Sequence, residues 1–538
     1  MDAKRIGVVA AIAVAGALLL LPARFRHRGK STRAETPAGP PVHVRLSVED
    51  GHETLPCRVH LTNERNEGVF PSGFPSFSDH FSFPGNGELE LAPGRYRYEI
   101  ERGPEYSRAS GSFEAEAPAR RVAVTLERVA NLAERGWFSG DLHVHRPPAD
   151  AELLMRAEDL HVGGFVTWWN DQPAAAATGL RAQVRKFDGD RFVDPTVGED
   201  ERQGGALLLL RLNEALALPH LYYDEKGRIA HKVGAEADEY PPAIELVRAA
   251  RAQGEVHVAL EKPFWWDTPT WVALGLVDSV GIAHNHMNRA GVRNHEAWGH
   301  KCDRAQYGDG PFANAYCTQD IYYRLLDAGF RLAPSAGSAS GVLPNPVGYN
   351  RVYVKSGSLP DLDTWWRLLG LGRSFVTNGP LLLVEANGEP PGSTLRAGNA
   401  PKLTVELGIE LTSVDPIATV ELVRDGAVAA RGVYDPAAHR VRFPALVFDK
   451  SGWFLVRALT DRTDTFRFAS TAPFYVEVGA VPRRISRAAV KFFRAWTDER
   501  IAAIEGSPLD ADKAKILVGF QREGARVWDK LLAEANAD

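Results

Sequence analysis

A short segment just over a quarter of the way along the chain carries an acid and two imidazoles at alternating positions. Asp141, His143 and His145 alternate with Leu142 and Val144. Successive side chains of a strand point to opposite faces, so the acid and both histidines would share one face while the apolar residues pack behind them. Two imidazoles two residues apart on a rigid strand can bind one cation, and a nearby carboxylate suits the same role. The pattern favours a metal site over a strand end with two solvated histidines.

More side chains of these types follow later apolar strands. In a strand–helix barrel, functional groups gather at the C-terminal ends of the strands. The candidates at such ends are, in chain order, Asn170, Asp171, Glu199, Asp200, Glu201, Glu261, Lys262, His284 and His286. A hydrolytic metal centre needs this kind of convergence, because imidazoles and carboxylates hold the ion while an open position holds water whose pKa the ion lowers.

Each candidate also has an ordinary structural explanation. The acidic run 199–201 can be a solvated loop, and Glu261 with Lys262 can be a surface ion pair worth under about 1 kcal/mol. The two-residue spacing of His284 and His286 repeats that of the first motif, which favours a functional role for them.

Alternating strands and helices must position these residues, and they extend from 131 to 395. Apolar runs such as 206–210 and 256–260 alternate with helical stretches such as 242–252. Continuous apolar strands separated by helices predict parallel pairing with helices covering the sheet. The chain has neither a P-loop ending nor a Gly-x-Ser-x-Gly elbow, so the sequence does not indicate nucleotide binding through a P-loop or serine hydrolase chemistry.

Segments with a period of two flank this region. Short strands separated by turn residues predict small β-sandwiches at 42–130 and 396–479. Two helices are expected in 480–538, and Gly506-Ser507-Pro508 predicts a helix stop, an N-cap and a proline at the first helical position. We expect the helix pair to pack on the body of the protein. The predicted fold class is multidomain α/β and β, with a barrel between two sandwiches.

Composition restricts the class of partner. The chain has 538 residues, 44% of them hydrophobic, and a net charge of −5. Such a chain can form two to four domains, and it lacks the basic field that nucleic acid requires, so no nucleic acid partner is expected. Three cysteines without a Cys-x-x-Cys pair argue against a thiolate zinc site and a disulfide framework, and they leave open one Cys302–Cys317 bridge in an oxidising compartment.

The first thirty residues have the outline of a targeting segment. Lys4 and Arg5 precede an apolar run at 6–23, which is typical of a signal peptide or a short membrane anchor. A Pro/Gly/Arg-rich linker follows at 31–41. We expect export, to a periplasmic, secreted or membrane-anchored location, with cleaved and retained leaders both open.

The motif at 140–145, Gly-Asp-Leu-His-Val-His, resembles the opening motif of the PHP-type metallohydrolases, in particular their CehA/McbA-like branch. The similarity continues in five later segments and covers about half the chain; those segments are 168–171, 198–202, 261–266, 347–354 and 372–380. The resemblance implies a distorted (β/α)7 barrel with one to three divalent metals, usually zinc, manganese or iron, and ester or phosphoester hydrolysis.

By position, His143 and His145 match the opening metal-binding pair of the family. One carboxylate, of Glu199 or Asp200, matches the acid of its second motif. Two motifs differ: Lys262-Pro263 stands where the family has His-Pro, and the stretch 337–341 reads Gly-Ser-Ala-Ser-Gly instead of Gly-Ser-Asp-x-His. We therefore expect one or two ions rather than three.

Two functional hypotheses follow. In the first, the protein is an exported hydrolase whose metal is held by the two histidines of the first motif together with Glu199, Asp200, Glu261 or His284. Lys262 or His286 would polarise the attacked bond or protonate the leaving group of a small-molecule or glycan-type ester, phosphoester or amide. In the second, the protein is an inactive relative in the cell envelope that binds glycan or protein partners.

Overall fold

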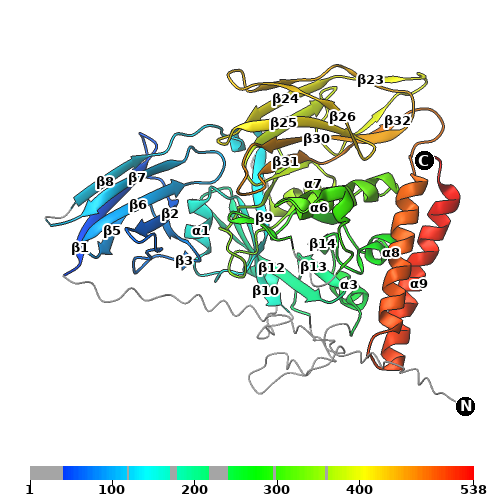
Figure 1. Ribbon diagram of the computed structural model, residues 1–538, viewed down its shortest axis with the longest axis horizontal. Helices are drawn as coiled ribbons and strands as arrows, with labels where there is room; N and C mark the ends of the chain where they lie inside the picture. Colours follow the sequence, from blue (N-terminus) through cyan, green and yellow to red (C-terminus); the bar gives the residue numbers. More distant parts are fainter. Residues whose placement is uncertain (1–39, 118–119, 170–178, 217–239, 295–298, 358–360) are drawn as a thin grey trace, which may run out of the picture. The chain divides into compact units, whose positions relative to one another are not determined.

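The computed structural model of the protein describes residues 40–117, 120–169, 179–216, 240–294, 299–357 and 361–538 (Figure 1). The predicted leader at 1–30 and most of the linker lie outside these ranges, as do Asn170, Asp171 and His295. None of the helices in the described ranges combines the length and apolar character that a membrane span requires.

Residues 42–125 fold into two sheets around one hydrophobic core, as the alternation predicts. The first sheet is β5 (Asn86–Leu91), β1 (Val42–Glu49) and β8 (Arg120–Thr125). The second is β3 (Ser76–Phe77), β4 (His80–Phe83), β2 (Cys57–Asn63), β6 (Gly94–Glu101) and β7 (Ala109–Ala115). In β1, Val44 and Leu46 are buried in the core while Arg45 faces solvent, which is the pattern of a strand with one covered face.

Seven central strands form a continuous run whose two ends meet. In sheet order they are β18 (Ala333–Ala336), β15 (Ser279–Ala283), β14 (His257–Leu260), β13 (Gly205–Leu210), β12 (Arg191–Arg202), β10 (Val162–Trp169) and β9 (Trp137–Val144). Ser340, just beyond β18, forms a parallel bridge with Val144 at the end of β9. The C-terminal ends of the first and last strands of the run therefore lie side by side. This region is α/β, and its assignment to the PHP type stays a prediction.

The prediction of parallel pairing is wrong for β13, which is antiparallel to both β12 and β14. Gln203 and Gly204 alone separate β12 from β13, and so short a connection can join only antiparallel strands. Gly205 then takes a φ of +145°, and a Cβ there would lie 2.8 Å from the Trp271 ring. The other pairs, β9–β10–β12 and β14–β15–β18, are parallel as expected.

The same sheet continues from β9 into the C-terminal strands. The continuation is β19 (Arg351–Lys355), β20 (Ser374–Thr377), β31 (Phe468–Thr471), β30 (Gly452–Thr460), β25 (Ile417–Arg424) and β26 (Ala427–Arg431), with β32 (Phe474–Glu477) and β22 (Thr394–Arg396) beside it. A further sheet is β21 (Leu381–Ala386), β24 (Leu407–Thr412), β28 (Arg440–Arg442) and β27 (Val433–Asp435). These strands share one core, to which Tyr353 of β19 and Phe375 of β20 also belong, so the C-terminal β core begins ahead of residue 396.

Short strands and helices complete the described residues. The short strands are β11 (Arg185–Phe187), β16 (Met287–Asn288), β17 (Gly291–Val292), β23 (Leu403–Val405) and β29 (Leu446–Phe448). The helices of the central region are α1 (Ala151–Ala157), α3 (Ala243–Arg251), α4 (Thr268–Ala273), α5 (Arg304–Tyr307), α6 (Ala313–Asp327) and α7 (Leu362–Gly370), with 3-10 turns at Ala133–Arg135 and Leu180–Gln183. A disulfide joins Cys302 to Cys317 in α6, so the single bridge that the cysteine count left open is present.

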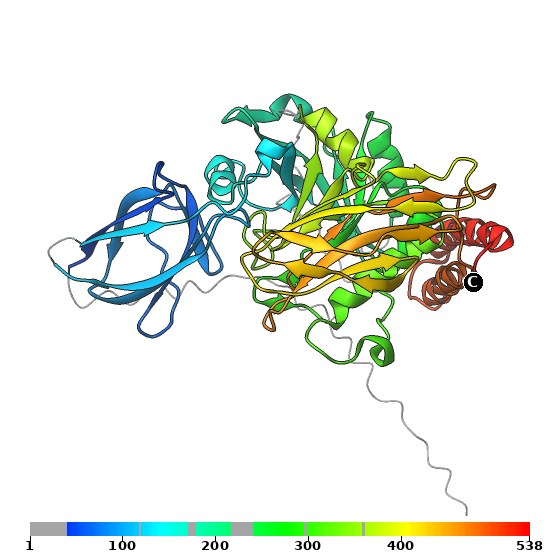
Figure 2. The same ribbon diagram turned by 90° about the horizontal axis from the view of Figure 1, so that it is seen from above.

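The C-terminal helices α8 (Arg487–Glu505) and α9 (Ala511–Glu534) pack side by side (Figure 2). Phe493 of α8 stacks on Trp528 of α9, and both belong to the central core, which confirms packing on the body of the protein. The prediction that Ser507 is the N-cap of the second helix is wrong. Asp510 caps α9 by accepting the backbone N–H groups of residues 512 and 513, whereas the Ser507 hydroxyl donates to Ile504 O at the end of α8.

Candidate metal centre

Strand β9 places the two histidines of the first motif as the alternation predicts. All eight residues of β9 are buried, and Leu142 and Val144 belong to hydrophobic clusters behind the sheet. Parallel pairing with β10 and antiparallel pairing with β19 fix the strand on both edges. His143 and His145 therefore leave a rigid support toward one side, where their rings lie 4.9 Å apart.

Glu199 from β12 meets these histidines and completes a triangle of potential ligand atoms. His143 Nε2 lies 2.9 Å from His145 Nε2, and Glu199 Oε2 lies 3.2 and 3.0 Å from the two nitrogens. Three ligands bound at about 2.1 Å from one ion lie about 3.0 Å apart at right angles and about 3.4 Å apart at the tetrahedral angle. The triangle thus has the size that a divalent first-row ion requires.

Burial adds a second indication that a cation fits between these groups. Glu199 Oε2 is buried and, among the described residues, no hydrogen-bond donor is aligned with it despite the two close imidazoles. A buried carboxylate oxygen in that state is costly unless a cation neutralises it. The residues present, two imidazoles and one carboxylate, are the ligand types that zinc, manganese and iron accept.

Glu261 was predicted as a ligand, and the structure places it on the other side of His143. Its Oε1 lies 3.1 Å from His143 Nδ1, away from the triangle that contains Nε2. A carboxylate in this position accepts the Nδ1–H proton and directs Nε2 into the triangle, where a metal ion would displace the proton of that nitrogen. Glu261 therefore suits orientation of a ligand rather than ligation.

Lys262 brings a fully buried ammonium group next to this carboxylate. Its Nζ lies 2.9 Å from Glu261 Oε2 and 3.7 Å from Glu201 Oε1, and 4.2 Å from the centre of the Trp265 ring. Burial alone would lower the pKa of Lys262, but the surrounding carboxylates raise it above its ordinary value. The group is held as a cation, and the sequence-based alternative of a surface ion pair is wrong because the side chain has no exposed area.

The pKa values of the three triangle residues reflect two opposing effects, burial and the charges of neighbouring groups. Burial opposes the charged form of His143, yet Glu199 and Glu261 raise its pKa to about 10. Burial lowers the pKa of His145. Burial would raise the pKa of Glu199, but His143 lowers it below its ordinary range, so the carboxylate is ionised. The acids provide a negative field that attracts a cation.

Asp141 shares the strand with the two histidines but has a backbone-anchoring role. Its Oδ1 accepts the N–H groups of His143 and Ser338, and its Oδ2 accepts the N–H of Gly348 at 2.7 Å. A carboxylate with three backbone donors is already satisfied. Asp141 ties β9 to the segment that follows β18.

The Gly-Ser-Ala-Ser-Gly stretch at 337–341 packs its backbone directly against β9. A Cβ at Gly337 would lie 2.5 Å from His143 Cβ, and one at Gly341 would lie 3.0 Å from His145 Cβ. Ala339 N–H donates to His143 O, and His145 N–H donates to Ser340 O, both at 2.7 Å. The stretch holds the two histidines in place through its main chain, and it contains no acidic or imidazole side chain.

Three other predicted site residues lie outside the triangle. Asp200 points to the opposite face of β12 from Glu199 and forms a bidentate pair with Arg202 at 2.6 and 2.8 Å. His284 Nδ1 accepts the backbone N–H of His286 at 3.2 Å, and its Nε2 lies 3.0 Å from Thr318 Oγ1, so both ring nitrogens are engaged. Burial lowers the pKa of His284 to about 3.

His286 lies beside His284, with ring centroids 5.8 Å apart, and 6.4 Å from the ring of Phe264. Within the described residues, the group of potential ligands at this site is His143, His145 and Glu199, without either later histidine. The repeated two-residue spacing misled the prediction because residues 284–286 follow β15 in a turn, where side chains do not alternate between faces.

Glu201, the third acid of the run 199–201, is the neighbouring acid to which the sequence-based hypotheses gave no ligand or catalytic role. It follows Glu199 by two residues in β12 and therefore shares its face. Its side chain is 25% exposed, whereas that of Glu199 is 1% exposed. Solvent thus reaches the cluster from the side of Glu201, and a strand prediction extended to residue 202 would have identified the acid.

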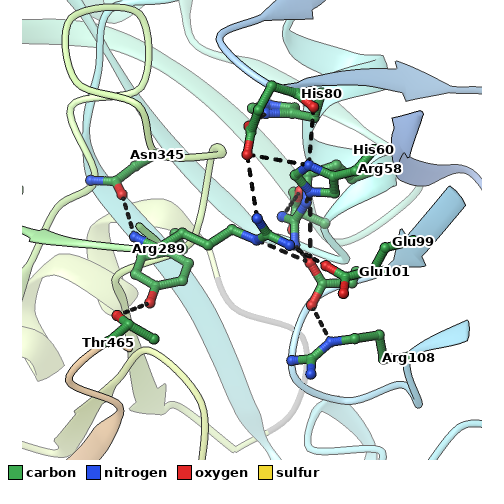
Figure 3. A network of polar contacts seen from close by, with 12 residues as sticks. Arg58, His60, His80, Glu99, Glu101, Arg108, Arg289, Asn345 and Thr465 are labelled. Carbon is green, nitrogen blue, oxygen red and sulfur yellow. Dashed lines mark hydrogen bonds and ion pairs between the residues drawn. The ribbon is translucent and has the colours of Figure 1, made fainter. Parts of the chain in front are cut away.

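Two further groups of acids and histidines occur in the described residues, and they overlap at His60. They are His60, Asp79 and His80, and His60, Glu99 and Glu101. Figure 3 shows arginines within both. Arg58 Nε donates to His60 Nε2 at 3.0 Å, and Arg289 pairs with Asp79 at 3.3 Å and with Glu99. Permanent guanidinium charges neutralise these acids and repel a metal ion, so the triangle at β9 is the better metal site.

The similarity found between this chain and known proteins is slight. No protein-family model matches the chain, and no curated protein matches it. A solved structure described as the Bacillus anthracis TIE protein shares 16% sequence identity over 19% of this chain and 18% of that chain, with a TM-score of 0.13. A likeness of this size has no bearing on the fold or chemistry of this chain.

Proposed function

We propose that the protein is a metal-dependent hydrolase of the PHP type that acts on an ester, phosphoester or amide of a small molecule or glycan. The observation that carries the proposal is the buried triangle of His143 Nε2, His145 Nε2 and Glu199 Oε2, whose sides measure 2.9 to 3.2 Å. A divalent zinc, manganese or iron ion held there would supply Lewis acidity and lower the pKa of water.

The residues around the triangle have distinct tasks. Glu261 accepts from His143 Nδ1 and so keeps the other ring nitrogen directed into the triangle. Lys262 forms an ion pair with Glu261. This pair prevents the Glu261 carboxylate from taking the place of His143 as a metal ligand. Glu201 lies on the solvent side, where a substrate approaches, and its carboxylate is placed to accept or donate a proton there.

The seven-stranded run supports the PHP assignment without establishing it. It places His143 and His145 at the C-terminal end of the first strand, where barrel enzymes assemble their active sites. The described residues form one triangle at β9, and the stretch 337–341 has no acidic or imidazole side chain, so a single ion at this site is the expected content.

Export is part of the same proposal. The apolar run at 6–23 motivates it, and the Cys302–Cys317 disulfide supports it because such bonds persist mainly in oxidising compartments. The leader is proposed as a signal peptide or a membrane anchor.

Metal analysis of the full chain tests the proposal. The purified protein is stripped with a chelator and reloaded separately with Zn²⁺, Mn²⁺ or Fe²⁺. Elemental mass spectrometry then measures the metal content, and a panel of aryl esters, phosphoesters and amides measures hydrolysis. We expect roughly one ion per wild-type chain and metal-stimulated hydrolysis, with loss of both in His145→Ala.

His257→Gln serves as the matched control, because His257 is a buried histidine in β14 that contacts Ser279 rather than the triangle. It should retain the ion. Unchanged metal content in His145→Ala, or no stoichiometric metal in the wild type, would overturn the proposal and favour the non-catalytic binding protein.

A further inference from the structure

A polar cavity whose lining includes none of the triangle's residues lies among residues from three groups of strands. Arg58 and Arg108 come from the N-terminal sandwich, Arg351 begins β19, and Arg467 precedes β31. The cavity has a volume of about 40 Å³. One water molecule needs roughly 10–15 Å³ of such space, so the cavity accommodates a few waters or one small ion and excludes a nucleotide.

Arginines outnumber acids in the lining of this cavity. The four guanidinium groups face three carboxylates, which are Glu101, Glu158 and Asp415. Because arginine stays charged in proteins, the lining carries a formal excess of one positive charge. Burial raises the pKa of Glu158, against the effect of Arg58, with which it forms an ion pair at 2.5 Å.

The carboxylates are already shared between arginines. Glu101 pairs with both Arg58 and Arg108, a wall of the cavity that Figure 3 shows. Asp415 lies 3.0 Å from Arg467 and 3.5 Å from Arg108. No lining acid is left over to neutralise a further guanidinium group.

Two guanidinium nitrogens of the lining lack an acceptor within the described part of the chain. Arg351 is 1% exposed; its Nε donates to Gly348 O at 2.6 Å and its Nη2 to Glu158 O at 3.1 Å, but its Nη1 has no partner. Arg467 Nε is also buried without a partner. A buried charged donor without an acceptor is unfavourable, so these nitrogens indicate a missing acceptor.

Two glycines keep the space beside Arg351 open. A Cβ at Gly103 would lie 3.1 Å from Arg351 Nη1, and one at Gly348 would lie 2.8 Å from Nη2. Both glycines also have positive φ values, +62° and +70°, which other residues adopt at a cost. The backbone therefore preserves room around the guanidinium group that has a free donor.

We propose that this cavity is a binding site for a small oxyanion, a sulfate, phosphate or carboxylate group, held by Arg351 Nη1 and Arg467 Nε. The planar guanidinium group presents its N–H donors in a fork that matches the oxygens of such anions. Because the lining comes from three groups of strands, an anion that binds only the native chain stabilises it, and the stabilisation grows with the logarithm of the anion concentration above the Kd. The residues that line this cavity include none of His143, His145 and Glu199.

Thermal unfolding and equilibrium dialysis of the full chain test the proposal with inorganic sulfate, inorganic phosphate and acetate as separate probes. Chloride at equal ionic strength is the reference, and anion concentrations stay below about 10 mM, where general salt effects on stability are small. We expect a rise in Tm that grows with the logarithm of anion concentration above the Kd, together with saturable, stoichiometric binding of at least one of the three anions in dialysis.

Arg467→Lys keeps the charge beside Asp415 but removes the forked donor, and it should raise the Kd about tenfold or more. Arg462→Lys is the matched control: Arg462 also contacts Asp415, at 3.4 Å, yet does not line the cavity, so its Kd should stay that of the wild type. If Arg467→Lys does not fold, Arg108→Gln, at a more exposed wall, replaces it. No binding of any probe, or equal Kd values in all variants, would overturn the proposal.

Discussion

Lys262 is the residue whose environment differs most from what its type suggests. A lysine directly after an acid is usually exposed, but this one is fully buried beside Glu261 and close to Glu201. Its ammonium group neutralises carboxylates that would otherwise repel one another next to Glu199. The same positive charge opposes the binding of a metal ion at the neighbouring triangle. Lys262 therefore stabilises the chain at the expense of metal affinity.

Replacing Lys262 with methionine should separate these two effects. Without a metal ion, Lys262→Met leaves the buried Glu261 Oε2 without its ammonium partner, and we expect a loss of roughly 3 kcal/mol in the free energy of unfolding. The variant should bind Zn²⁺ or Mn²⁺ more tightly than the wild type, so metal should restore part of the loss. Urea unfolding with and without metal measures both. A metal-free variant as stable as the wild type would contradict the assigned ion pair.

The sequence could predict some site residues and not others, for reasons visible at single positions. His143 and His145 were predictable because they alternate with core residues in a strand. Glu199 could not be separated from Asp200 without knowing that β12 extends to residue 202, which puts the two acids on opposite faces. That Glu261 lies at Nδ1 of His143 rather than in the triangle depends on packing between distant strands, which no local pattern encodes.

At the scale of elements, the chain around α6 is held by a covalent link. Cys302 lies in the loop before α5, and Cys317 lies in the second turn of α6, whose helix also supplies Thr318 to His284. In the central region, local sequence patterns predicted the strands and helices. They did not predict the antiparallel direction of β13, which the two-residue turn between β12 and β13 imposes. The disulfide and the hairpin both restrict the chain more tightly than propensity alone.

The Cys302→Ala/Cys317→Ala double variant should be less stable than the wild type by roughly 3 kcal/mol, the loop-entropy value for about fifteen residues. The sequence separation of the two cysteines is 15. Calorimetric unfolding measures the difference, and a reductant should lower the Tm of the wild type while leaving the double variant unchanged. Cys57→Ala is the control for a free buried thiol. Equal Tm values for wild type and double variant would show that the bridge adds no stability.

At the scale of the whole molecule, stability in acid depends on buried groups in separate layers. Burial lowers the pKa of His257 to about 4 and that of His80 to about 3. Asp327 acts in the opposite direction, because burial raises its pKa to about 6 and protonation between that value and its ordinary range favours the native state. Each histidine is neutral in the native chain down to its lowered pKa, so we expect both to contribute to a fall in stability below pH 6.5.

For His257 the sign follows from its neutral form in the native state. Above its ordinary pKa of 6.5, both the native and the unfolded chain hold it neutral, and it makes no difference to the pH dependence. Between pH 6.5 and about 4 the unfolded chain binds the proton and the native chain does not, so stability falls by up to about 3 kcal/mol. Below pH 4 both states are protonated and this contribution becomes constant. Asp278 opposes the shift, while Arg211 and Arg251 reinforce it.

His257→Gln should therefore flatten the fall in unfolding free energy between pH 6.5 and 4, because glutamine keeps a donor for Ser279 and does not titrate. Urea unfolding at half-unit steps of pH measures the slope, with His439→Gln as the control at an exposed loop position. The control should follow the wild type over the whole range. A wild-type slope retained in His257→Gln would show that the acid response arises from other groups, His80 first among them, since its burial is as complete.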